Sequence, residues 1–163
     1  MELAPIYLQL RDAITKVVPL EHGLAPSEDL PRVWGVLVDV GLPPGPVTLV
    51  AIADTTTSFY LGSGGATVGV GGVPDVAAAA RELLRRVDAA LGAFSPTWET
   101  PIPPEGGVGF TALTYQGMVA HRSTMETLQQ PGNPVGPAWW QTGVVVGMIQ
   151  DLERRTKREA PGG

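Results

Sequence analysis

The residues whose types suit catalysis or ligand binding gather in a glycine-rich stretch, ADTTTSFYLGSGGATVGVGG, at residues 53–72. Its carboxylate and hydroxyl groups, with one histidine from a later segment, make up the candidate ligand site: Asp54, Thr56, Ser63 and His121. A carboxylate or an imidazole can act as a general base, and an activated serine hydroxyl can act as a nucleophile. A cleft in which these four side chains converge would favour binding of a small molecule or an anion, and catalysis on it.

The glycines of this stretch do not complete a known phosphate-binding motif. A Walker loop requires a lysine and a hydroxyl residue after its glycines, and although Gly64 and Gly69 have the required spacing, no lysine follows. The dinucleotide motif also fails, because Thr67 stands in place of its third glycine. We therefore expect Gly62–Gly72 to form turns and close contacts and not to bind a nucleotide. The alternative is an anion held by backbone N–H groups.

Single polar residues have structural explanations beside the chemical ones. Ser63 has Leu61 where a nucleophile elbow has its first glycine, which argues against catalysis. His121 falls in a predicted strand, where we expect the backbone to satisfy one ring nitrogen. Asp54 precedes two threonines and favours an Asx turn. Asp39 interrupts an apolar strand and would need a partner if buried; we favour a position at the strand end where it faces solvent or accepts hydrogen bonds from the following turn.

A second set of candidate residues lies near the C-terminus and suits protein–protein contact. Trp139 and Trp140 are adjacent and point about 100° apart on a helix, so both are buried only if the helix is covered on two sides. Gly143 and Gly147 would let another backbone approach closely. We expect a homodimer whose interface includes this helix or an adjacent strand edge. The alternative is that the proline-rich loop 95–107 covers the second tryptophan.

Apolar periodicity predicts the elements that position these residues. We expect helices at 3–18, 74–92 and 138–159, strands at 33–40, 47–53, 57–61 and 66–70, and a hairpin at 108–122. Helices segregated from a mainly antiparallel sheet indicate an α+β fold in two or three layers. We expect one domain at 1–158, followed by a frayed tail at 159–163.

Each of these helices carries an apolar stripe that predicts the buried face. In helix 3–18 the stripe consists of Leu3, Ile6, Tyr7, Leu10, Ile14, Val17 and Val18. In helix 74–92 the stripe consists of Val76, Ala80, Leu83, Leu84, Val87 and Leu91. In helix 138–159 it consists of Trp140, Val144, Met148 and Leu152. The charged residues of helix 74–92 fall mostly on the opposite face, where we expect solvent: Arg81, Glu82, Arg85, Arg86 and Asp88.

Composition excludes several classes of function. Hydrophobic residues make up 44% of the 163 residues and charged residues 17%, which is typical of a folded domain. The net charge of −5 argues against a nucleic-acid partner. The absence of cysteine removes disulfides and thiolate nucleophiles, and with two histidines we expect neither a metal nor a cofactor. Glu2 stands where a signal peptide carries positive charge, and no apolar run reaches the ~20 residues of a membrane span, so we expect a cytoplasmic protein.

The order of the predicted elements over residues 3–155 resembles the roadblock and dynein light-chain family and, more loosely, profilin-like sandwiches. The segments WGVLVDVGLPPGPVTLVAIA and DTTTSFYLGSGG are also similar to an uncharacterised bacterial family with no established activity. The first resemblance implies a dimer that serves as a platform for small GTPases or cytoskeletal partners. The extra strand at 57–61 and the loop at 95–107 depart from the roadblock pattern.

Two hypotheses about function follow. The first is a non-enzymatic interaction module, active in assembly or regulation, that dimerises and presents a surface to another protein. The second is a small-molecule or anion-binding protein, and even an enzyme, that uses the loops at 54–65. An exposed apolar helix or sheet face would favour the first. Convergence of the four candidate ligand residues in a cleft would favour the second.

Overall fold

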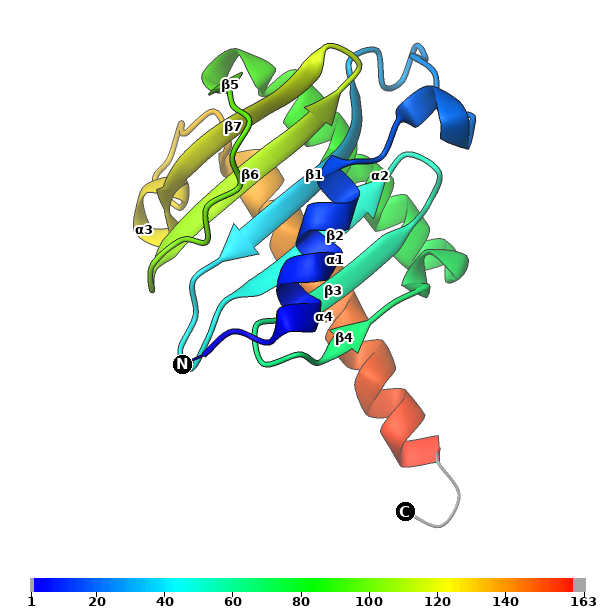
Figure 1. Ribbon diagram of the computed structural model, residues 1–163, viewed down its shortest axis with the longest axis vertical. Coiled ribbons are helices and arrows are strands. Elements are labelled where there is room, and N and C mark those ends of the chain that lie inside the picture. The colour runs from blue at the N-terminus through cyan, green and yellow to red at the C-terminus, as the bar shows by residue number, and fades with distance from the viewer. Residues whose placement is uncertain (1, 160–163) are drawn as a thin grey trace.

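The computed structural model describes residues 2–159 as a seven-stranded antiparallel sheet with helices on both faces (Figure 1). The strands are β1 Val33–Val40, β2 Val47–Ile52, β3 Thr57–Leu61, β4 Ala66–Thr67, β5 Ser95–Pro96, β6 Gly107–Thr114 and β7 Gly117–Thr124. The α-helices are α1 Pro5–Thr15, α2 Pro74–Ala89, α3 Met125–Leu128 and α4 Gly136–Glu159. Short 3-10 helices occupy Pro19–His22, Val70–Gly72 and Leu91–Ala93. The predicted α+β class is confirmed. The last residues of the predicted tail, 160–163, lie outside the described residues.

The sheet has the strand order β4-β3-β2-β1-β6-β7-β5, with β1 and β6 near its centre. All eight residues of β1 are buried, because the β-branched sequence VWGVLVDV is covered on both faces. The predicted strands match β1 and β3 over their full length, and the predicted hairpin is β6–β7. The predicted strand at 66–70 is shortened to β4, because the chain enters a 3-10 helix at Val70.

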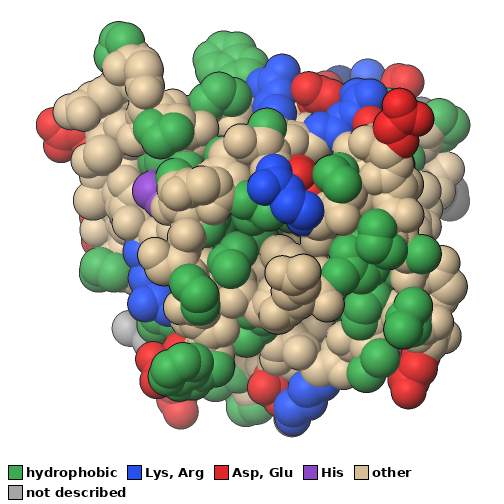
Figure 2. All heavy atoms as spheres, turned by 90° about the horizontal axis from the view of Figure 1, so that it is seen from above, with side chains coloured by type: hydrophobic (Ala, Val, Ile, Leu, Met, Phe, Trp, Pro, Cys, Tyr) green, Lys and Arg blue, Asp and Glu red, His purple; other side chains and the backbone are tan. Residues whose placement is uncertain are grey.

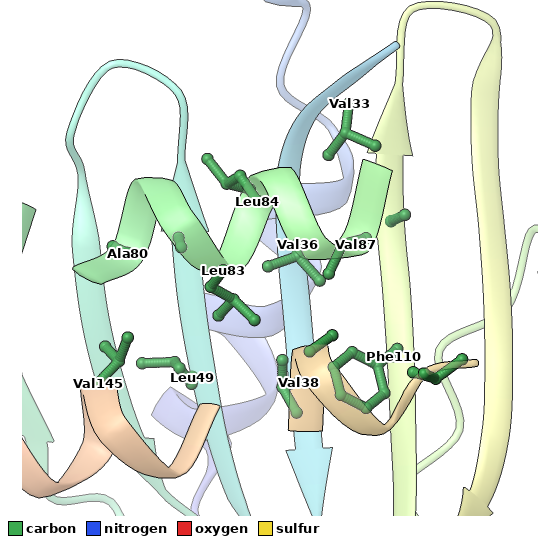
Figure 3. Close-up of a cluster of buried hydrophobic side chains, with 14 of the residues drawn as sticks. Val33, Val36, Val38, Leu49, Ala80, Leu83, Leu84, Val87, Phe110 and Val145 are labelled. Carbon is green, nitrogen blue, oxygen red and sulfur yellow. The ribbon is translucent and has the colours of Figure 1, made fainter. Parts of the chain in front are cut away.

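Helices α2 and α4 cover one face of the sheet, and α1 covers the other (Figure 1). The first face holds the larger core, in which Leu83 and Leu84 of α2 meet β1, β2, β6 and α4 (Figure 3). This confirms the predicted buried stripe from Val76 to Val87, whereas Leu91 lies beyond α2 in a 3-10 helix. Asp88 was predicted on the opposite face but is buried, and its carboxylate accepts hydrogen bonds from Arg32 and from the backbone N–H of Val33. The second core is smaller and includes Tyr7 of α1 with Leu37 and Val50 of the sheet.

A polar network anchors α1 to the smaller core and corrects the expectation for Asp39. Only 1% of Asp39 is exposed, and Arg11 donates to both of its carboxylate oxygens at 3.0 and 2.7 Å. The Thr48 hydroxyl also donates to Asp39 at 2.6 Å and is 2.7 Å from the hydroxyl of Tyr7. Burial lowers the pKa of Arg11, but the hydrogen bonds to Asp39 and the negative charge of Asp39 together outweigh that effect, so the pKa is raised overall.

The glycine-rich stretch forms turns and close contacts, as predicted. Gly64 and Gly69 have φ angles of +110° and +73°, a conformation that favours glycine. A Cβ on Gly71 would lie 1.7 Å from the carbonyl oxygen of Thr55, so no larger residue fits there. Asp54 accepts a hydrogen bond of 2.9 Å from the backbone N–H of Thr56, which confirms the Asx turn.

Candidate protein-interaction surface

The structure does not bring the four candidate ligand residues together. Asp54 and Thr56 lie in the turn that precedes β3, whereas Ser63 follows β3 at its other end. His121 lies on β7, and three strands separate β7 from β3. Its Nδ1 atom is 2.9 Å from the carbonyl oxygen of Ala93, so a backbone group satisfies this ring nitrogen as expected. The cleft that would have favoured the second hypothesis is therefore not formed by these residues.

The inner face of α4 differs from the predicted stripe. The fully buried residues are Ala138, Val145 and Ile149, with Thr142 on the same face. The Thr142 hydroxyl donates to the carbonyl of Ala138 at 2.9 Å, so its polar group is satisfied within the helix. The predicted stripe lies beside this face, and its first member, Trp140, points outward. From 138 to 149 only Gln141 and Thr142 are polar, and apolar residues or glycines occur on every side of the helix, so periodicity alone could not select the buried side.

A polar contact and the core together fix the rotation of α4. Gln141 is buried and its side-chain amide donates to the carbonyl of Ala79 on α2 at 2.9 Å. Arg86 of α2 donates to the carbonyl of Pro137 at 3.0 Å. Because both contacts tie the first turns of α4 to α2, the opposite side of α4 is held toward solvent.

The outer face of α4 exposes apolar and small residues, namely Trp140, Gly143, Val144 and Gly147, and we call these the outer α4 face. Trp140 is 73% exposed and Val144 is 37% exposed. A Cβ built on Gly143 or Gly147 would have no atom within 4 Å apart from the helix's own backbone. A second helix could therefore approach this face closely, since no described part of the chain occupies it.

Loop 95–107, the alternative cover for Trp140, does not lie over this tryptophan. Ile102 of loop 95–107 packs against the α1 side of the sheet, and the carbonyl of Thr100 accepts a 2.9 Å hydrogen bond from Arg11. Trp98 in the same loop is 85% exposed. The loop therefore covers the sheet face opposite α4 and leaves Trp140 exposed. Trp139, by contrast, is partly buried and packs against the larger core.

A groove of about 680 Å³ adjoins the outer α4 face. Its walls are the first turns of α4, the end of α3 and the loop between them: Leu128, Gln129, Gln130, Gly132, Asn133, Pro134, Gly136, Pro137, Trp139, Trp140 and Gly143. Asn133 fixes this loop, because its side chain accepts from the N–H of Val135 at 2.9 Å and donates to the carbonyl of Thr127 at 3.1 Å. The groove is thus a preformed apolar surface beside an exposed tryptophan.

A second groove, of about 690 Å³, lies between the β3–β4 edge and the C-terminal half of α4. Phe59, Leu61, Val70 and Leu152 give it apolar walls, and Gly65 contributes from the glycine-rich stretch. Thr67 of β4 donates a hydrogen bond to Glu153 of α4 across it. Its volume lies within the range of ~300–1,000 Å³ that is typical of small-molecule sites.

Figure 2 shows no large patch of a single charge on this side of the molecule, because Lys and Arg lie among Asp, Glu and hydrophobic side chains. Among the side chains of residues 2–158, no three His, Asp or Glu lie close enough together to hold a metal ion. In the same part of the chain, none of the helices has the length and apolarity needed to cross a membrane.

Comparisons with protein-family models, with curated proteins and with solved structures found no match for this chain. The geometry described above is therefore what supports an inference about function.

Proposed function

We propose that the protein is a non-enzymatic interaction module that forms a homodimer through the outer α4 face. The observation that carries the proposal is the exposure of Trp140, 73%, on a face where Val144 is also exposed and the two glycines have open space. Exposed apolar surface beside a preformed groove is typical of sites that bind another protein. A tryptophan at the centre of such a surface can contribute much of the binding free energy.

The resemblance to roadblock domains adds a class of partner to this proposal. A dimer of this kind would act as a platform, with a small GTPase as the expected partner and assembly or regulation as the role. The roadblock resemblance, the GTPase and the cytoplasmic location all stay predictions.

Light scattering coupled to size-exclusion chromatography tests the dimer. We expect the wild-type protein to be dimeric at high micromolar concentration and Trp140→Ala to be monomeric with an unchanged circular dichroism spectrum. Trp98→Ala is the matched control, because Trp98 is even more exposed but lies in loop 95–107; this variant should stay dimeric. A wild-type monomer at this concentration would contradict the proposal.

A small-molecule function is the second candidate, and the groove between β4 and α4 is the observation that favours it. Leu61 and Gly65, which line this groove, belong to the stretch that the sequence singled out. The apolar walls suit a hydrophobic ligand. Binding of a fluorescent fatty-acid analogue that Gly65→Trp abolishes would support this candidate, whereas no saturable fluorescence change would exclude that ligand class.

A further inference from the structure

We propose that the two α4 helices of the dimer run antiparallel, so that Trp140 of one copy packs against Asp151 and Arg154 of the other. The inference rests on the proposed dimerisation and specifies its geometry. It also commits the groove beside Trp140 to one occupant, the C-terminal turns of α4 from the second copy.

The first observation is that the outer side of α4 changes character along its length. From Gly136 to Ile149 the helix contains no charged residue. Asp151, Arg154 and Arg158 then continue the same side of the helix at steps of three and four from Gly147. Arg154 and Asp151 form an ion pair of 3.1 Å, with side chains that are 65% and 61% exposed. The side thus has an uncharged half and a charged half.

This asymmetry distinguishes the two ways in which a two-fold axis can pair the helices. In a parallel pair, each residue of the face lies near its own copy, which places Arg154 near Arg154 and Arg158 near Arg158, and Asp151 offsets only part of this positive charge. Like charges placed directly opposite one another oppose association. In an antiparallel pair, the charged half of each helix lies against the uncharged half of the other, and the opposite partial charges of the helix ends also become neighbours. The charge pattern therefore favours the antiparallel pair.

The two open glycine positions set the register. If Gly143 of one copy faces Gly147 of the other, Trp140 lies opposite Gln150, one residue from Asp151 and one helical turn, about 5–6 Å, from Arg154. An indole N–H can donate to the carboxylate, and a guanidinium can stack on the indole face. In this register, the indole N–H of Trp140 has Asp151 of the second copy as its partner, and the indole face has Arg154.

The C-terminal turns of α4 have the position and exposure that this arrangement requires. They extend beyond the sheet in Figure 1, and residues 154–158 are all exposed. In the antiparallel pair these turns of the second copy lie beside the first turns of α4, where Gln129, Gln130 and Asn133 form the groove wall. The groove of one copy then holds the C-terminal turns of α4 from the second copy, which are uncovered in the monomer.

Cysteine cross-linking tests the orientation with little interference, because the chain contains no cysteine. Gln130→Cys places a thiol on the groove wall and Arg158→Cys places one on the C-terminal turns; both positions are exposed. We expect a short bismaleimide to link the two variants when they are mixed, and to link Arg158→Cys to itself only weakly. Adding Trp140→Ala to both variants should abolish the mixed product.

The results that would contradict the antiparallel arrangement differ from those that would contradict the dimer. If light scattering shows a dimer but Arg158→Cys links mainly to itself, or no mixed product forms, the antiparallel arrangement is wrong and the proposed dimer stands. If the protein is monomeric, the proposed function fails as well. A second variant, Arg154→Glu, should raise the dimer dissociation constant severalfold, and Arg85→Glu on α2 should leave it unchanged; equal effects would contradict a contact at Arg154.

Discussion

Helices α2 and α4 pack side by side on the same face of the sheet, yet their outer faces differ. The outer face of α2 carries arginines that are paired with carboxylates: Arg81 and Arg85 bind Asp29 at 2.7 and 2.5 Å, and Arg86 binds Glu82 at 3.1 Å. Hydrogen bonds from Arg85 and Arg81 lower the pKa of Asp29. The outer face of α4 instead exposes Trp140, Val144 and two glycines.

The difference indicates that the outer face of α2 needs no partner in the monomer, whereas the outer α4 face leaves apolar side chains uncovered. An amphipathic helix such as α2 needs only water on its charged side, whereas a helix that is apolar all round needs cover on both sides. The first half of α4 belongs to the second kind. The comparison predicts that substitutions on the outer face of α2 change little, and that those on the outer α4 face change association without changing the fold.

The exposed ion pairs of α2 contrast with the buried pair that Arg11 of α1 forms with Asp39 of β1. Arg11→Ala should lower the free energy of unfolding by about 3–5 kcal/mol, because it leaves the Asp39 carboxylate buried without its cation. Urea denaturation measures this loss. The double variant Arg11→Met with Asp39→Leu should recover most of it, since no charge is then buried; a loss as large as that of the single variant would contradict this explanation.

The next effect separates the two sides of α2. Leu84→Ala should cost about 2–5 kcal/mol, because Leu84 is buried in the larger core and its truncation leaves a cavity. Arg85→Ala should change the midpoint of thermal unfolding little, because its ion pairs are exposed to solvent. Equal melting temperatures for the two variants would show that the buried face of α2 is placed wrongly.

The same test on α4 separates folding from association. Ile149→Ala should cost about 2–5 kcal/mol in dilute samples, because Ile149 is fully buried in the larger core. Trp140→Ala should leave the unfolding midpoint of the same dilute samples almost unchanged. A large destabilisation by Trp140→Ala in the monomer would mean that the outer α4 face contributes to the fold itself.

We expect the glycine-rich stretch to bind no nucleotide. Titration with ATP, GTP or NAD should give no saturable change in tryptophan fluorescence or melting temperature below millimolar ligand. The glycines serve turns and close packing, and the lysine of a phosphate loop is missing. A micromolar dissociation constant that a bulky residue at Gly64 or Gly65 abolishes would overturn this interpretation.

The sequence predicted β1, β2, β3, the β6–β7 hairpin and α2 well, because each has a clear pattern, whereas β4 is shorter than predicted and β5 falls in the predicted loop 95–107. β1 is a mainly apolar run, β3 ends in Phe59, Tyr60 and Leu61, both strands are bounded by turn residues, and the stripe of α2 faces mostly charged residues on its other side. The pattern failed for α4, where apolar residues surround the helix and two polar residues, Gln141 and Thr142, lie on the buried side. Hydrogen bonds to Ala79 and Ala138 make that burial possible, and local sequence does not encode such long-range partners.

The buried pair of Arg11 and Asp39 was missed for a related reason. Asp39 was recognised as a charge within an apolar strand, but its partner lies 28 residues earlier in the chain. A signal did exist: Arg11 falls four residues after Tyr7 and three before Ile14, on the apolar side of α1. Two opposite charges on two predicted buried faces indicate a pair. The groove beside α4 had no such signal, because it depends on how the loop 129–135 folds.

Oxidative footprinting of the tryptophans tests most directly whether the outer α4 face is covered in solution. Brief exposure to hydroxyl radicals, followed by mass spectrometry, measures the reactivity of Trp140 and Trp98 in one sample over a range of protein concentrations. We predict that the reactivity of Trp140 falls as the concentration rises, whereas that of Trp98 stays constant, because only Trp140 lies on the proposed interface. Equal, concentration-independent reactivity of both tryptophans would contradict the account.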